Sequence, residues 1–231
     1  MTFAELKLAI RSDPNPNSRY ERFLNKLPLP EFNKRGKDAA WDIWYFSDNT
    51  AFCRRTAGLY LTELDDLRDE NKKSRKLLRL DDKADHHPNF TFDKFRWSFG
   101  NFCFYLYAAL ESFYHEANIL YELRIERRAV SFSEIKKTLG NCSLANHMET
   151  FHSDEDMKLF IEYRNAFMHG YIFPISGSSD GRLFLKRQPR MEKFSFSDMC
   201  LDANQFVTVV FARVDRFICD GWRCFEKDQL T

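Results

Sequence analysis

The sequence predicts an all-α protein, a bundle of about four main helices with short extra helices and one small β-hairpin. Two features support this fold class. Glycine and proline are scarce, with 8 and 7 among 231 residues, so long helices can run without interruption. Hydrophobic residues make up 44% of the chain, and along several stretches they recur every three or four residues, which is the period of one buried helix face. A chain of this length can bury a substantial core.

The N-terminal segment 1–37 is expected to be an irregular arm, because it holds four of the seven prolines. Residues 38–231 are expected to form a single helical domain. Its first long helix should begin near Asp38, continue into the basic stretch Lys72–Arg79 and end before Pro88. The apolar residues that recur along it at roughly helical intervals are Trp41, Trp44, Tyr45, Phe52, Leu59, Leu64 and Leu67.

The second long helix has the clearest period and is expected to end near the basic segment Arg124–Arg128, because cations favour a helix C-terminus. Its predicted buried face consists of Phe95, Phe99, Phe102, Leu106, Ala109, Leu110, Phe113, Ala117 and Leu120. A short helix should follow, with Ser131 or Ser133 at its start and Gly140 at its end.

A further helix is expected to begin at Ser153, because a hydroxyl cap followed by three carboxylates suits the positive end of a helix dipole. It should end at His169, with Gly170 as its terminator. Two short apolar runs then surround a glycine-rich turn and predict a β-hairpin at about 171–190. A last long helix is expected from about Ser197.

The charge and cysteine patterns limit the compartment and the ligands. With 35 basic and 34 acidic residues, no global field attracts a polyanion. No apolar run approaches the ~20 residues that span a bilayer, and the first residues lack a secretory signal, so we expect a cytoplasmic protein without a membrane partner. The six cysteines form no CxxC pair, and the set Cys142, His147 and His152 fits no common zinc spacing. We therefore expect neither a metal nor another cofactor.

The helix over 157–169 carries an unusual group of polar residues. On a helical wheel, Arg164 falls within the predicted apolar stripe of Met157, Phe160, Ile161 and Met168. A guanidinium cannot lose its charge to escape burial, so this position requires a partner or a wet cleft. Asn165 and His169 are four residues apart and share the neighbouring face. One helix end thus offers a fixed cation, an amide and an imidazole.

A purely structural interpretation of these residues stays open. Arg164 can pair with a carboxylate such as Glu111, and His169 can simply favour the helix C-terminus. Glu111 and His115 are themselves four residues apart on the second long helix. They form either a surface pair or a support for Arg164. The Trp and Phe stripes are expected to be core rather than base-stacking platforms, unless one of the rings is exposed.

The segment Tyr163-Arg164-Asn165-Ala-Phe-Met-His169-Gly170-Tyr171 resembles the signature of the HEPN superfamily. That signature is an arginine, usually followed by a polar residue, and then a histidine near the end of a helix in a bundle. The resemblance covers about 155–171, and the rest of the chain agrees in architecture only. It implies a HEPN-like bundle and metal-independent RNA cleavage. Because two such motifs meet across an interface in the family, it also implies a homodimer.

The resemblance gives each residue of the motif a role. His169 would take the proton from a ribose 2′-hydroxyl or protonate the leaving oxygen, since imidazoles titrate close to neutral pH. Arg164 would hold the scissile phosphate through its planar fork, and Asn165 would orient the pair. The expected product is a 2′,3′-cyclic phosphate, and DNA should resist because it lacks the 2′-hydroxyl.

Outside the motif, the hairpin supplies cations that would hold RNA phosphates beside the site, although such charges are often only a solvated face. They are Arg182, Lys186, Arg187 and Arg190. Tyr171 resembles the tyrosine that is adenylylated in HEPN toxins paired with nucleotidyltransferase antitoxins. The alternative is that Tyr171 simply begins the first hairpin strand. This resemblance implies a toxin or host-defence effector, with such a transferase as a partner.

Two other functions remain open at this point. One is a non-catalytic HEPN module that binds RNA, a nucleotide or a protein through Arg164. The other is a purely structural helical protein.

Overall fold

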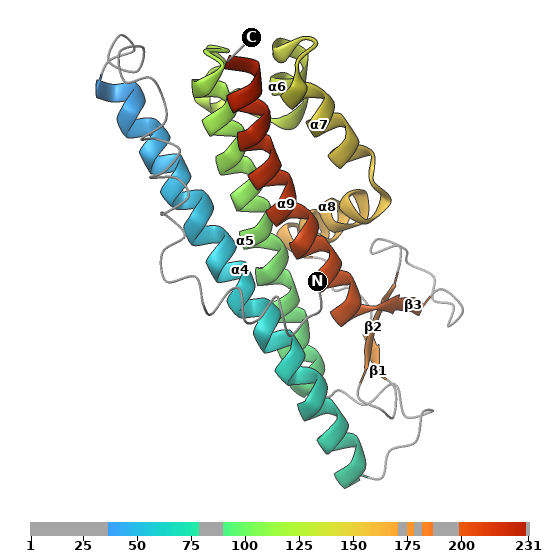
Figure 1. The fold of residues 1–231 in the computed structure, drawn as a ribbon. Coiled ribbons are helices and arrows are strands. Elements are labelled where there is room, and N and C mark those ends of the chain that lie inside the picture. Colours follow the sequence, from blue (N-terminus) through green and yellow to red (C-terminus); the bar gives the residue numbers. More distant parts are fainter. Residues whose placement is uncertain (1–36, 79–89, 171–174, 178–181, 187–198, 230–231) are drawn as a thin grey trace. The chain divides into compact units, whose positions relative to one another are not determined.

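The computed structural model describes residues 37–78, 90–170, 175–177, 182–186 and 199–229, and this part of the chain is mostly helical (Figure 1). Its elements, in chain order, are α4 (Lys37–Leu78), α5 (Phe90–Leu120), the 3-10 helix η1 (Arg127–Ala129), α6 (Phe132–Leu139), α7 (Ser143–Ser153), α8 (Glu155–Met168), β1 (Ile175–Gly177), β2 (Leu183–Lys186), β3 (Met199–Asp202) and α9 (Ala203–Gln229). The prediction of an all-α fold with a small β element is confirmed. The arm 1–36 and the predicted break at Pro88 lie outside the described residues.

Contacts between residues group the chain into two compact units. The first unit consists of residues 1–55, 106–153 and 214–231, and the second of residues 56–105 and 154–213. The first unit therefore contains η1, α6 and α7, and the second contains α8 and the three strands. Helices α4, α5 and α9 each contribute a segment to both units. Whether residues 38–231 form a single domain stays a prediction.

The predicted buried face of α5 is confirmed. All nine of its apolar residues, from Phe95 to Leu120, are buried. The stripe predicted for α4 is partly wrong. Leu64 and Leu67 are buried, but Tyr45, Phe52 and Leu59 are exposed. These three residues are spaced by seven, or about two helical turns, and so share one face of the helix. The buried face of α4 consists instead of Ile43, Phe46, Ala57, Leu61, Leu64 and Leu67, among others.

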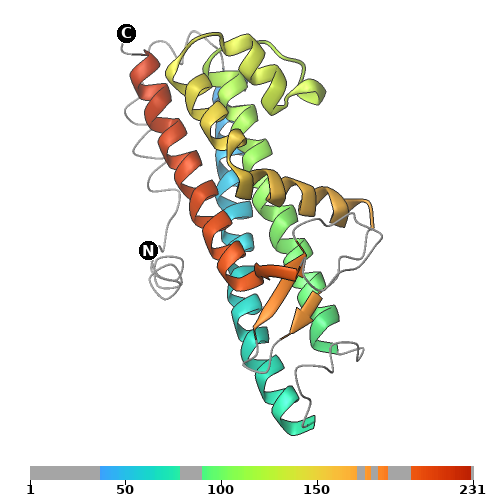
Figure 2. The same ribbon diagram turned by 90° about the vertical axis from the view of Figure 1, so that its right-hand side faces the viewer.

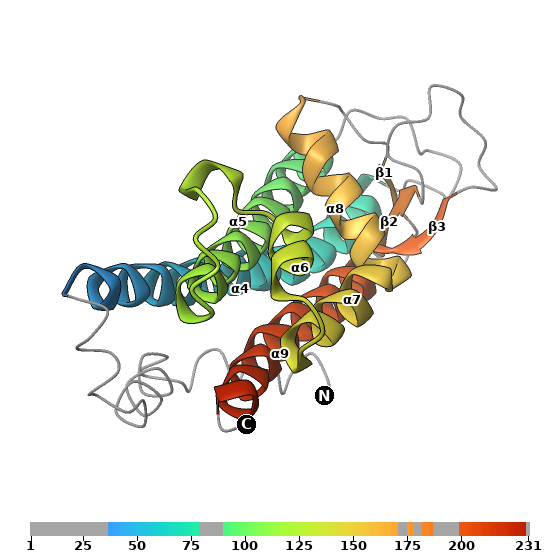
Figure 3. The same cartoon turned by 90° about the horizontal axis from the view of Figure 1, so that it is seen from above.

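The caps predicted for the short helix α6 are confirmed. Ser131 Oγ accepts a hydrogen bond from the backbone N–H of Glu134 at 3.4 Å, and Gly140 ends the helix with a φ of +67°. Helix α7, which lies beside α6 (Figure 3), was not predicted. Its first N–H groups, those of Ser143 and Leu144, donate to the carboxylate of Asp228 on α9 at 3.1 and 3.3 Å. Local sequence therefore carries little signal for its start.

Helix α8 begins one residue later than predicted. Its cap is Asp154, whose carboxylate accepts hydrogen bonds from the N–H groups of Asp156 and Met157 at 3.0 and 3.3 Å. Ser153 is instead the last residue of α7, and its hydroxyl donates to the carbonyl of Thr150 at 2.9 Å. A carboxylate took the capping position because it carries a full charge at the positive end of the helix.

The predicted hairpin is confirmed and belongs to a three-stranded antiparallel sheet (Figure 2). Strand β1 pairs with β2, with Ser176 opposite Phe184, and β2 pairs with β3, with Leu185 opposite Leu201. The third strand corrects the expected start of the last helix, because residues 199–202 are extended. Asp202 then caps α9 by accepting a hydrogen bond from Gln205 N at 3.1 Å.

No helix within the described ranges is long and apolar enough to cross a membrane. The five cysteines whose side chains the structure describes are free thiols.

Candidate functional site

Aromatic packing in the second unit holds helix α8, which carries the Arg164–His169 motif. Tyr163 is fully buried, and its ring meets Phe99 of α5 edge-on with a centroid separation of 5.1 Å. On its other side the Tyr163 ring lies 5.9 Å from that of Phe206 on α9. Burial is the main reason why the pKa of the Tyr163 phenol is raised. The residue before Arg164 is thus an apolar anchor.

The C-terminal half of α8 approaches α5 at a glycine. The ring of Phe167 lies directly over Gly100, so closely that a Cβ atom built on Gly100 would be 2.1 Å from Phe167 Cε2. Only a residue without a side chain fits this contact. The contact therefore determines which residue of α5 lies against the C-terminal end of α8, where the motif ends.

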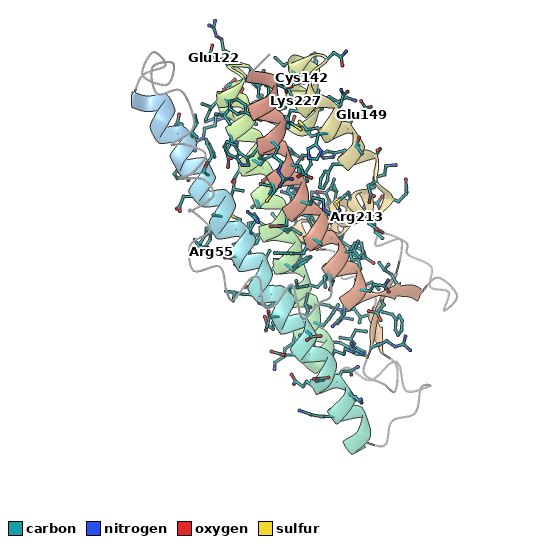
Figure 4. All side chains as sticks on the ribbon, in the orientation of Figure 1. Arg55, Glu122, Cys142, Glu149, Arg213 and Lys227 are labelled. Atoms are coloured by element: carbon teal, nitrogen blue, oxygen red, sulfur yellow. The ribbon has the colours of Figure 1, made fainter. Side chains whose placement is uncertain are left out.

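An ion-pair cluster holds the opposite end of α8 to α9. The guanidinium of Arg213, labelled in Figure 4, pairs with the carboxylate of Asp154 and, at 3.1 Å, with that of Asp156. Asp154 is also the helix cap, so the ion pairs with Arg213 stabilise the first turn of α8. The motif is therefore anchored at both ends of its helix.

The position of Arg164 on α8 differs from the prediction. The buried residues of this helix are Met157, Phe160, Tyr163 and Ala166, whereas Met168 is exposed. The apolar face is thus turned toward Tyr163, whose large ring dominates the packing. Arg164 consequently lies beside the buried face and is half-buried. A half-buried guanidinium keeps its charge at a smaller desolvation cost than a fully buried one.

Arg164 and Asn165 are joined directly. Arg164 Nη1 donates a hydrogen bond to Asn165 Oδ1 at 3.1 Å, and both side chains are half-buried. The amide oxygen uses one N–H of the guanidinium and orients its plane. A guanidinium has five N–H donors in a fixed fork, so a single hydrogen bond of this kind does not use all of them.

His169 ends α8 with its side chain exposed. Its backbone N–H still donates to the carbonyl of Asn165 at 3.1 Å, while Gly170 donates to Phe167 at 3.0 Å and adopts a φ of +72°. The glycine is required there because this left-handed conformation is strained for residues with a Cβ atom. The imidazole is therefore carried on a well-defined backbone and is open to solvent.

The remaining predicted site residues are not brought together by the described contacts. His115 is half-buried in the first unit and stacks on Phe46 with a centroid separation of 4.4 Å. Burial, followed by the positive charge of Arg127, lowers its pKa. Glu111 is exposed. Support of Arg164 by these two residues stays a prediction.

The hairpin cations are described only in part. Arg182 is exposed, and its guanidinium lies 5.6 Å from the centre of the Phe184 ring. Lys186 ends β2 opposite Met199. Arg187, Arg190 and Tyr171 lie outside the described residues. Binding of RNA by the hairpin stays a prediction.

Within the described ranges, no group of three or more His, Cys, Asp or Glu side chains is placed to hold a metal ion. The histidines of α7 are engaged in packing instead. His147 Nε2 donates to the carbonyl of Phe217 at 3.0 Å, and His152 Nε2 shares a hydrogen bond of 2.6 Å with the hydroxyl of Tyr114. Burial lowers the pKa of His152 to about 4.

Two residues of interest gave no signal in the sequence. Glu116 of α5 is completely buried in the first unit and hydrogen-bonded to Thr50 of α4, 66 positions away. Trp97 of α5 lies in a helix with a strongly apolar core face, yet 64% of its surface is exposed. Neither property follows from local sequence, because each depends on which helices become neighbours.

Comparison of the chain with protein-family models, with curated proteins and with solved structures finds no match. The likeness to the HEPN signature therefore rests on the residues of α8 and its C-terminus alone.

Proposed function

We propose that this protein is a metal-independent endoribonuclease of HEPN type, in which Arg164, Asn165 and His169 form one half of a composite site. The observation that carries the proposal is the hydrogen bond from Arg164 Nη1 to Asn165 Oδ1, with His169 exposed at the end of the same helix. This arrangement offers a phosphate-binding cation beside a group that can transfer a proton.

The reaction that suits these groups is an internal transesterification. The ribose 2′-oxygen attacks the adjacent phosphorus, its proton passes to an imidazole, and the bond from phosphorus to the 5′-oxygen breaks. A second imidazole donates the proton that the leaving 5′-oxygen needs. Arg164 stabilises the negative charge that develops on the phosphoryl oxygens. The products are a 2′,3′-cyclic phosphate and a free 5′-hydroxyl.

Two imidazoles are needed in this scheme, and the motif supplies one per chain. We therefore propose a homodimer in which His169 of each copy serves one role. A cytoplasmic toxin or host-defence role, with a nucleotidyltransferase antitoxin that modifies Tyr171, is the biological setting that the resemblance suggests. The intact mass of the protein after co-expression with such a transferase tests this setting, since adenylylation adds a fixed mass at Tyr171.

The decisive experiment is cleavage of end-labelled single-stranded RNA in EDTA by the wild type and by His169→Ala. We expect cyclic phosphate ends from the wild type and a loss of at least about 10²-fold in the variant, the usual contribution of a general acid or base. Lys158→Ala is the matched control, because Lys158 is an exposed cation on the same helix. It should cut like the wild type. The corresponding DNA should stay intact.

Cleavage that needs a divalent ion, or that survives in His169→Ala, would contradict the proposal. RNA that binds without being cut would favour a non-catalytic module that uses Arg164 as an anion anchor.

A further inference from the structure

Helix α5 exposes two aromatic side chains on one face in the second unit. Trp97 is 64% exposed and Phe104 is 36% exposed, although most aromatic residues of this helix are buried. The two residues are seven positions apart and so face the same side, separated by about 10 Å along the helix axis. Large aromatic surfaces are normally shielded from water, so exposed ones that share a face indicate a contact site.

This face of α5 borders the end of α8. Trp97 and Phe104 stand one turn before and one turn after Gly100, the residue on which the Phe167 ring lies. Arg164 precedes Phe167 by three residues and therefore lies on the neighbouring side of α8. The exposed rings therefore flank the point at which α5 contacts the helix that carries the candidate site.

The charges beside the two rings are paired. Arg96 forms an ion pair with Asp93 at 2.8 Å, and Lys94 forms one with Glu70 at 3.5 Å. Asn101, which lies between the two rings on this face, is uncharged. The surface thus offers flat apolar rings rather than an excess of positive charge. Stacking, and not attraction of phosphates, is the interaction it can provide.

We propose that Trp97 and Phe104 are a stacking platform for the unpaired bases of single-stranded RNA that enters the Arg164–His169 site. This inference rests on the proposed function, because the site beside the rings identifies the occupant. Bases in a duplex are stacked on each other, so only a single strand can place its bases on protein rings. The platform should select unpaired RNA with little preference for sequence, because every base has an aromatic face.

The test uses a probe that the platform binds but the reaction cannot consume. Fluorescein-labelled oligo(dT) of twelve nucleotides lacks the 2′-hydroxyl, and oligo(U) of the same length is used with the His169→Ala background. Binding is measured by fluorescence anisotropy in EDTA. The variants are Trp97→Ala, Trp97→Phe and Leu59→Ala. Leu59 is the control, since it is 68% exposed, apolar and in the same unit.

We expect Trp97→Ala to weaken the binding of both oligomers about tenfold, the usual effect of removing one stacking ring. Trp97→Phe should recover most of the affinity, because it keeps a ring, and Leu59→Ala should bind like the wild type. Because few phosphates are contacted, the logarithm of the binding constant should fall only slightly with the logarithm of salt, with a slope of about −0.7 for each phosphate.

Equal binding by the wild type and Trp97→Ala overturns the platform, and so does failure of the wild type to bind either oligomer. A Trp97→Ala protein that binds normally but changes from dimer to monomer in light scattering also overturns it, and assigns the face to a protein contact. If oligo(dT) binding depends on Trp97 while RNA is not cut by the wild type, the platform stands and the proposed ribonuclease activity fails. If RNA is cut but oligomer binding does not depend on Trp97, the ribonuclease activity stands and the platform fails.

Discussion

Thr50 of α4 donates its hydroxyl hydrogen bond to the carboxyl group of Glu116 on α5 at 2.6 Å, inside the first unit, where no surface of either residue is exposed. Burial raises the pKa of Glu116 to about 8, although Thr50, Arg54 and Ser47 act in the opposite direction. An apolar interior disfavours the charged carboxylate more than these three groups favour it. Glu116 is therefore protonated in the folded protein at neutral pH.

This protonation makes stability depend on pH. Between an unfolded value of about 4.5 and the folded pKa of about 8, the folded chain binds one more proton at Glu116 than the unfolded chain. The contribution of Glu116 to the free energy of unfolding therefore falls as the pH rises through this window, by up to about 1.4 kcal/mol per pH unit. Urea unfolding at pH 5 to 8 measures it.

Glu116→Gln keeps the shape and the polar contact but cannot ionise. We expect this variant to lose the decline between pH 5 and 8, and to exceed the wild type in stability at pH 8. Glu111→Gln, an exposed position five residues earlier on the same helix, should keep the wild-type profile. An unchanged decline in Glu116→Gln would show that another group causes it.

Some elements of this chain are determined by residues close to them in the sequence, and others by residues far away. The buried face of α5 and the caps of α6 were predictable, because each depends on residues within a few positions of one another. Helix α7 was not, since its first N–H groups donate to Asp228, 85 and 84 positions away. Strand β3 was missed for the same reason. Its hydrogen-bonding partner is β2, and its own four residues carry no strand pattern.

The candidate site shows the same division. The order of Arg164, Asn165 and His169 on one helix end could be predicted, because a helix fixes the relative positions of residues four apart. The burial of Arg164 could not be predicted, because it depends on how α8 turns to pack the Tyr163 ring against Phe99. The exposure of Trp97 likewise reflects which sides of α5 its neighbours cover.

Asp228 is expected to stabilise α7 from a distance. It accepts hydrogen bonds from Ser143 N, Leu144 N and the hydroxyl of Tyr121, the last at 2.7 Å. Burial tends to raise the pKa of this carboxyl, but these hydrogen bonds lower it overall. Asp228→Ala should lower the free energy of unfolding at pH 7 by about 1–2 kcal/mol, as loss of a helix cap does. Urea unfolding measures the loss.

The pH dependence of that loss follows from the lowered pKa. The stabilisation is complete above the unfolded value near 3.8 and disappears as the pH falls through the lower folded value, so the difference between wild type and Asp228→Ala should shrink in acid. The control is Asp220→Ala, which removes a surface ion pair with Arg223 and should cost little. A difference that stays constant in acid would contradict the capping role.

Gly100 is expected to control the position of the candidate site. In Gly100→Ala the new methyl group would overlap the Phe167 ring, so the ring and the end of α8 must shift. We expect destabilisation by about 1–2 kcal/mol, typical of overpacking, and weaker RNA cleavage because His169 moves with the helix end. Thermal unfolding and the cleavage assay measure the two effects.

The double variant Gly100→Ala/Phe167→Ala makes this test specific. Removing the ring opens space for the methyl group, so the effect of Gly100→Ala should be much smaller in the Phe167→Ala background. Such non-additivity is expected for residues in contact. If the two substitutions add independently, the contact between Gly100 and Phe167 does not set the geometry of the site.

Arg164→Lys separates the charge of the guanidinium from its shape. Lysine keeps one positive charge but lacks the planar fork, so it cannot hold Asn165 Oδ1 and two phosphate oxygens in a fixed geometry at once. If the proposed reaction is right, kcat/KM for RNA should fall by about 10²-fold, comparable to losing a donor to the transition state. Arg68→Lys, an exposed position on α4, should cut nearly as well as the wild type. Full activity in Arg164→Lys would mean that a point charge suffices. If Arg164→Lys lowers the thermal unfolding temperature together with the activity, Arg164 acts through the packing of α8. A group that only binds phosphate would leave thermal unfolding unchanged.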